Sequence, residues 1–158
     1  MSQTTVAPVT YAFTVPISAQ RAFTLFTEGF NTWWIGHHIG EAELAEAVIE
    51  PRVHGRFYER GVDGTECDWG KVLVYEPPSR LLLAWQLNSE FTYDPDLSHA
   101  SEVEVRFTEE GGQTTVNFEH RHFERIGVHG AELATYVSAD GGWPAILDLY
   151  AKAAAAAA

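Results

Sequence analysis

The sequence predicts a single α+β domain whose sheet is mainly antiparallel. Strand-like segments follow one another through connections shorter than the dozen or more residues that a parallel crossover needs. A pair of helices is expected after the first strand, and an amphipathic helix near the end of the chain. The 158 residues are close to the usual length of one domain and contain no internal repeat. We therefore expect one domain over residues 1–158.

The N-terminal part predicts one strand followed by two helices. Residues 10–15 are rich in β-branched and aromatic side chains, which is typical of a strand, and Pro16 ends it. Ser18 is the expected N-cap of an amphipathic helix. The apolar positions of this helix fall at helical spacing: Ala22, Phe23 and Phe26. A second short helix or a turn is expected over residues 31–35.

Six further strands are expected in the middle of the chain. In residues 102–107 and 114–120 apolar side chains take every second position, so one face of each strand is buried and the other is solvated. Asp63-Gly64 marks a hairpin turn, and Gly111-Gly112 marks another. The six predicted ranges are 45–50, 54–60, 67–76, 80–87, 102–107 and 114–120.

The last predicted element is a helix that lies on the sheet. Its apolar stripe has i, i+3, i+4, i+7 spacing: Trp143, Ile146, Leu147 and Tyr150. Pro144 is tolerated only in the first turn, so the helix should begin between Ser138 and Gly142. Residues 129–136 are expected to form a separate helical piece. We expect an ordered core over about residues 9–152 and a tail at Ala153–Ala158.

Composition excludes several classes of function. There are 22 acidic against 10 basic residues and a net charge of −12, so neither nucleic acid nor an anionic membrane is an expected partner. No stretch approaches the ~18 apolar residues of a membrane span, and residues 1–8 do not read as a secretion signal. The single cysteine, Cys67, fits a reducing compartment. We therefore expect a cytoplasmic protein.

Aromatic residues are the unusual feature of the composition. Five Trp, six Tyr and nine Phe make up 13% of the chain. So many bulky rings need either a large core or a wall around a bound molecule. The sequence alone does not separate a filled core from a hollow one.

Several segments together resemble the homologues of the activator of the heat-shock-protein-90 ATPase, within the START and birch-pollen-allergen-like (SRPBCC) superfamily. In chain order they are EPRVHGRFYERGVDG, WGKVLVYEPPSRLLLAWQL, SEVEVRF, GGQTTVNFEHRHFE and GGWPAILDLY. The resemblance covers about residues 10–150. It implies a helix-grip fold, in which a curved antiparallel sheet of six or seven strands wraps around a long C-terminal helix. It also implies a hydrophobic cavity between the helix and the sheet.

Three hypotheses about function follow. The first is a non-enzymatic module of metabolism or stress response that binds a small hydrophobic or aromatic molecule without a cofactor, with its mouth near the loop at 36–44. The expected ligand-binding residues are Trp33, Trp34, Phe57, Trp69, Trp85, Phe118, His120, Trp143 and Leu147. The second is an enzyme of the same fold, a cyclase, dehydratase or hydrolase, with His120 as general acid or base. The third is a chaperone-associated interaction protein, and a homodimer is compatible with each.

A few polar residues offer alternatives. His120 and His122 share a strand face if the strand continues that far, but nothing nearby completes a zinc pattern, so no metal site is expected. His120 is either a satisfied core histidine or a polar group that contacts a ligand. Glu59 is a site candidate if it, rather than Tyr58, faces inward. Cys67 is expected to be a structural thiol.

Overall fold

The computed structural model describes residues 6–34 and 37–158. Seven strands form one sheet: β1 (Val9–Val15), β2 (Leu44–Ile49), β3 (Arg56–Gly61), β4 (Glu66–Glu76), β5 (Arg80–Trp85), β6 (Ser101–Glu110) and β7 (Gln113–Arg121). Their order in the sheet is β1-β7-β6-β5-β4-β3-β2, and neighbouring strands are antiparallel. The predicted α+β class and curved antiparallel sheet are confirmed.

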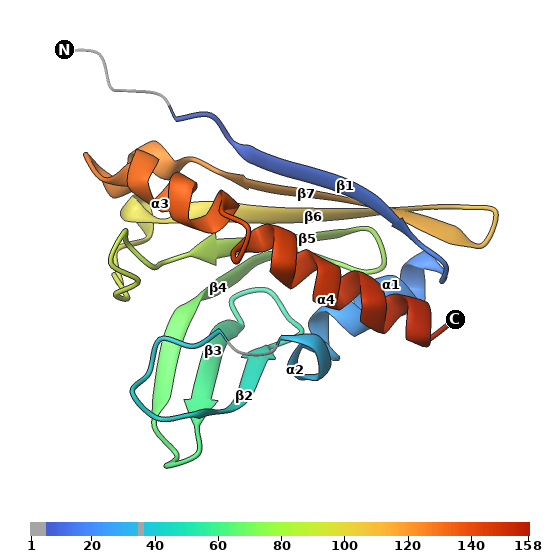
Figure 1. The fold of residues 1–158 in the computed structure, drawn as a ribbon, viewed down its shortest axis with the longest axis horizontal. Helices are drawn as coiled ribbons and strands as arrows, with labels where there is room; N and C mark the ends of the chain where they lie inside the picture. The colour runs from blue at the N-terminus through green and yellow to red at the C-terminus, as the bar shows by residue number, and fades with distance from the viewer. Residues whose placement is uncertain (1–5, 35–36) are drawn as a thin grey trace.

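The helices lie against one face of this sheet (Figure 1). They are α1 (Ala19–Thr27), α2 (Phe30–Trp33), α3 (Gly130–Ser138) and α4 (Trp143–Ala156), with two 3-10 turns, η1 (Leu97–His99) and η2 (Phe123–Ile126). Figure 1 shows α3 and α4 following each other across the sheet, with α1 and α2 near the C-terminal part of α4. Ile35 and Gly36, which fall in the second predicted helix and the loop after it, lie outside the described residues.

Local signals place the first helix as predicted. The Ser18 hydroxyl accepts a hydrogen bond from the backbone N–H of Arg21 at 3.2 Å, so Ser18 is the N-cap of α1. The three apolar positions of its stripe are all buried: Ala22, Phe23 and Phe26. Helix α1 therefore turns this stripe toward the core.

The outer face of the sheet carries paired charges, as the alternation in β6 and β7 predicts. Glu104 accepts hydrogen bonds from Arg80 Nε at 2.6 Å and from Arg121 Nη1 at 2.9 Å. Burial raises the pKa of Glu104, but the hydrogen bonds from these two arginines outweigh it and lower the pKa to about 2. The acidic strand residues are thus partly neutralised on the sheet itself, while Val103 and Val105 face the core.

The C-terminal region differs from the prediction in two details. Ser138, offered as a start of the last helix, ends α3, and α4 begins at Trp143 after Gly142. A Cβ on Gly142 would lie 2.3 Å from the carbonyl oxygen of Val137, so this tight junction requires glycine. The alanine run expected as a tail instead continues α4 to Ala156, and Ala154 is fully buried. Alanine suits both roles because it favours helix and occupies little space.

Beneath the C-terminal part of α4 the core is filled with aromatic rings. The Tyr150 ring lies 5.2 Å from Phe26, 5.2 Å from Trp33 and 6.1 Å from Phe13, each in an edge-to-face arrangement. The Tyr150 hydroxyl donates a hydrogen bond to the Ala22 carbonyl at 2.7 Å, which joins α4 to α1. In this part of the interior the aromatic rings therefore form a packed core, which is the first of the two explanations given for the high aromatic content.

We expect Tyr150→Phe to lower the free energy of unfolding by about 1 kcal/mol, because it removes one buried hydrogen bond and keeps the ring. Tyr150→Ala should lower it by about 3–5 kcal/mol, because it also removes the ring contacts. Urea denaturation of the two variants and the wild type measures both changes. Equal losses for the two variants would show that the ring contacts contribute little.

Candidate ligand-binding cavity

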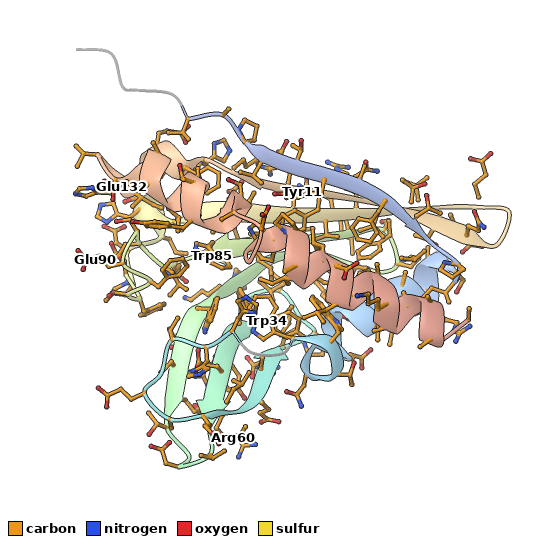
Figure 2. All side chains as sticks on the ribbon, in the orientation of Figure 1. Tyr11, Trp34, Arg60, Trp85, Glu90 and Glu132 are labelled. Carbon is orange, nitrogen blue, oxygen red and sulfur yellow. The ribbon has the colours of Figure 1, made fainter. Side chains whose placement is uncertain are left out.

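A cavity of about 410 Å³ lies at the N-terminal end of α4, where the interior is not filled. The sheet contributes Trp69 from β4 and Trp85 from β5, and Trp34 follows α2. Trp143 and the α3–α4 junction close the opposite side. Figure 2 labels Trp85 beside the start of α4 and Trp34 below this helix. The site therefore lies near the start of the last helix rather than along its length.

Four of the residues that line the cavity are tryptophans whose rings contact one another in a closed circuit, which we call the tryptophan quartet: Trp34, Trp69, Trp85 and Trp143. The centroids of successive rings are 5.5, 5.3, 5.5 and 6.1 Å apart, and the interplanar angles are 87, 85, 61 and 64°. Edge-to-face contacts of this kind are the arrangement that the ring quadrupoles favour. Each ring thus limits the tilt of its neighbours and keeps the wall in one shape.

Hydrogen bonds to the protein fix three rings of the quartet. Trp34 Nε1 donates to the His37 carbonyl at 3.0 Å, and Trp143 Nε1 donates to His120 Nδ1 at 3.0 Å. Trp69 Nε1 donates to Glu59 Oε1 at 2.8 Å. These bonds hold the indoles in place, so their shape as a wall is set before any ligand enters.

The sequence left open whether Glu59 or Tyr58 faces inward. In the structure it is Glu59, which is 2% exposed. Besides the Trp69 indole, its carboxylate accepts from the backbone N–H of Ile39 at 2.5 Å and of Gly40 at 3.2 Å. Three donors therefore surround this carboxylate. It joins the loop after α2 to the quartet but is not among the residues that line the cavity.

His120 does not line the cavity, in contrast to the prediction. It is fully buried behind Trp143, and its Nε2 lies 2.8 Å from the Ser101 hydroxyl oxygen. Because Nδ1 accepts from Trp143, the neutral imidazole carries its proton on Nε2 and donates it to Ser101. Burial lowers the pKa of His120 to about 3. Both ring nitrogens are occupied, so this is a core histidine that positions Trp143, and the geometry does not support it as an acid or base.

The structure divides the predicted ligand-binding residues into two groups. Four of the nine line the cavity, and they are the tryptophan quartet. The other five lie in the packed core behind or beside it: Trp33, Phe57, Phe118, His120 and Leu147. The four members of the quartet could be predicted from the sequence because they lie in segments with recognisable patterns. Whether a buried side chain reaches the cavity or stays in the core behind it depends on tertiary packing, which the sequence pattern does not show.

Part of the rim of the cavity was missed by the sequence analysis. His37 belongs to the loop at 36–44 that was predicted at the mouth, but Phe91, from the connection between β5 and β6, and Tyr136 and Val137, from α3, were not predicted there. Phe91 has a φ of 58°, which a non-glycine residue adopts at some cost in energy, and its ring lies 6.3 Å from that of Tyr136. Residues 86–100 carry no regular apolar period, so no signal in the sequence placed Phe91 here.

The sequence analysis left open whether strand β7 continues as far as His122, and the structure shows that it does not. Strand β7 ends at Arg121, and His122 has a φ of 65°, so His120 and His122 do not share a strand face. Within residues 6–34 and 37–158 no group of three or more His, Cys, Asp or Glu side chains is placed to hold a metal ion. No helix in the same residues is long and apolar enough to cross a membrane.

Comparison with known proteins identifies the family to which the chain belongs. Residues 16–154 match the family model described as activator of Hsp90 ATPase homolog 1-like protein. The chain belongs to this family. The solved structure of an anthrahydroquino-γ-pyrone synthase, Txn09, is 32% identical, with a TM-score of 0.66, and the match covers 96% of this chain and 99% of that one. No curated protein matches the sequence.

Two further solved structures share the fold of this family member. The self-sacrificing resistance protein CalC from Micromonospora echinospora is 32% identical, with a TM-score of 0.66 and 93% of each chain covered. Protein NE0264 from Nitrosomonas europaea has the same TM-score, 0.66, at 11% identity, with 96% of each chain covered. The likeness to NE0264 shows the fold alone.

The state of His120 predicts how stability depends on pH. Its pKa is about 3 in the folded protein, against an ordinary value of 6.5. Below about pH 6.5 the unfolded chain therefore takes up a proton that the folded chain does not, so acid lowers the free energy of unfolding. From about pH 7.5 to about pH 4.5 this contribution should be about 2–3 kcal/mol.

Urea denaturation across this pH range, with His120→Gln beside the wild type, measures the contribution. The variant should be less stable at neutral pH and should lose less stability on acidification. His129→Gln is the matched control, because the His129 side chain is 60% exposed, and it should keep the wild-type slope. An unchanged slope in His120→Gln would contradict the assignment.

Proposed function

We propose that this protein binds a planar, polycyclic aromatic molecule in the cavity bounded by the tryptophan quartet. The observation that carries the proposal is the quartet itself, because four large rings line a space of about 410 Å³ that no side chain fills. Sites for small molecules have volumes of roughly 300–1,000 Å³ and are mostly apolar. A flat aromatic guest would meet both the faces and the edges of these rings.

Charge and the solved relatives support the same class of ligand. The net charge of −12 disfavours a strongly anionic guest and is compatible with a neutral or cationic one. The synthase that is 32% identical over nearly its whole length is named for an anthrahydroquino-γ-pyrone, which is a polycyclic aromatic compound. The proposed ligand therefore resembles in chemistry what that relative's name describes.

A second candidate is ring-forming catalysis on such a molecule, and the likeness to the synthase favours it. Among the described lining residues, those with titratable side chains are His37 and Tyr136. His37 Nε2 lies 3.0 Å from the Gly141 carbonyl oxygen, which links the loop after α2 to the α3–α4 junction. Proton transfer in this cavity would use these two side chains in place of His120.

Binding is tested by titrating tryptophan fluorescence with two neutral polycycles, hydroxymethyl-anthraquinone and hydroxymethyl-anthracene. At least one should quench the signal saturably, because the quartet provides four of the five emitting indoles, whereas the saturated tetracycle androstanol should bind more weakly. Absence of saturable quenching by both aromatic polycycles would overturn the proposal. Mass spectrometry after incubation with an anthraquinone that carries an open polyketide side chain reports the loss of water on ring closure and so tests the catalytic candidate.

The double variant Phe91→Ala and Tyr136→Ala should weaken binding of the polycycle about tenfold, because two rim rings lose their contact area with the guest. Tyr58→Ala is the matched control. The Tyr58 ring lies against Arg56, 3.9 Å from the guanidinium carbon, and does not line the cavity. Equal affinities for the double variant and the control would place the ligand elsewhere.

A further inference from the structure

Two acidic side chains are buried among the described residues, and they differ in how their charge is balanced. Glu104 forms ion pairs with three arginines, Arg80, Arg106 and Arg121. Glu59 is 2% exposed and forms no ion pair with any Lys, Arg or His side chain in the described part of the chain. Burying a charge without an opposite charge is costly, so Glu59 needs an explanation.

The groups around Glu59 satisfy its oxygens but do not balance its charge. Two backbone N–H groups and the Trp69 indole donate to the carboxylate, and all three donors are neutral. Arg56 and Arg60 lie on the same strand as Glu59, but each forms ion pairs with other carboxylates. No positive side chain among the described residues therefore offsets this buried negative charge.

The Trp69 indole connects this charge to the cavity. Trp69 lines the cavity, and its Nε1 donates to Glu59 Oε1 at 2.8 Å. Donation to a carboxylate polarises the indole, so its ring becomes more electron-rich. A cation is attracted to the ring of a tryptophan, and a charge also acts through space, so no atom of Glu59 has to reach the cavity surface. Trp34 donates instead to a neutral carbonyl, so the Trp69 side of the quartet is the more negative one.

Nothing else that lines the cavity opposes this field. None of the described lining residues is an Asp, Glu, Lys or Arg. Helix α3 ends at Ser138 and helix α4 begins at Trp143, so the negative end of one helix dipole meets the positive end of the other, and their effects largely cancel. The charge of Glu59 is therefore the nearest full charge that a guest beside Trp69 would experience.

We propose that the ligand of this cavity carries a positive charge, an ammonium group on its polycyclic aromatic framework, and that Glu59 supplies the opposite charge from behind Trp69. The proposed function, on which this inference rests, is also met by a neutral guest. The net charge of −12 attracts a cationic ligand to the protein, whereas Glu59 decides where in the cavity the ammonium group lies. Glu59 is thus the specificity-determining residue of the site.

The first test uses the wild-type protein and three ligands with one ring system. Aminomethyl-anthracene and hydroxymethyl-anthracene have nearly the same size, but only the amine is charged at about pH 7. Fluorescence titration at low salt should show the amine binding about tenfold more tightly than the alcohol. Anthracene carboxylate should bind more weakly than the alcohol, because its charge has the same sign as that of Glu59.

The outcomes separate this inference from the proposed function. Equal affinities for the amine and the alcohol would overturn the inference and leave the proposed function intact. If neither the alcohol nor the anthraquinone of the binding test binds, the proposed function fails, and this inference fails with it.

Two variants assign the preference to Glu59. Glu59→Gln keeps the length of the side chain and removes its charge, so the ratio of the amine affinity to the alcohol affinity should fall about tenfold. Glu110→Gln is the matched control, because it removes the same charge from an exposed residue. Strand β6 begins opposite Trp85 and ends at Glu110, so this control lies far from the cavity and should keep the wild-type ratio. An unchanged ratio in Glu59→Gln would contradict the proposal.

A second pair of variants leaves the Glu59 side chain in place, in case Glu59→Gln does not fold. Trp69→Phe removes the hydrogen bond to Glu59 and leaves a less electron-rich ring. Trp34→Phe makes the same change in a ring whose N–H donates to the His37 carbonyl. The ratio of the two affinities should fall about threefold further in Trp69→Phe than in Trp34→Phe. Equal falls in the two variants would show that Glu59 does not act through Trp69.

Discussion

The hydrogen bond from Trp143 to His120 is the contact on which the cavity depends. It joins the first residue of α4 to strand β7 and so fixes where the last helix begins to cover the sheet. Because the bond occupies Nδ1, it also sets the tautomer of the imidazole, which then donates to Ser101. A fully buried histidine is tolerated here because it is neutral and both its nitrogens are paired.

The same helix covers two different kinds of interior. Around Tyr150 the rings interlock and leave packed core, whereas around Trp143 four indoles stand edge to face and leave a space. The cavity lies at the break between α3 and α4, where Gly142 allows the chain to pass close to Val137, and the packed core lies two turns further along α4. The aromatic excess therefore serves as both core and wall, at the start and in the middle of α4.

Polar groups around the quartet follow one pattern. Glu59 receives the Trp69 indole and two backbone N–H groups, and the His37 carbonyl receives the Trp34 indole. Among the described residues, two buried side-chain polar atoms have no hydrogen-bond partner, Trp85 Nε1 and the neighbouring Gln86 Oε1. Family membership shows the fold, while the proposed class of ligand rests on the rings that line the cavity. A chaperone partner, a homodimer and a cytoplasmic location stay predictions.

The sequence by itself determined the strands, their faces and the amphipathic helices, because periods of two and of 3.6 residues are local properties of the chain. It also singled out the tryptophans, which lie in segments with clear periods or turn signals. Only the tertiary structure decided which rings enclose space, why His120 lies behind the wall, and how Phe91 reaches Tyr136. These features depend on residues far apart in the chain and on the unpatterned connection at 86–100. The local spacing of apolar residues does not predict such contacts. How deeply a side chain is buried in a packed interior depends on the whole fold.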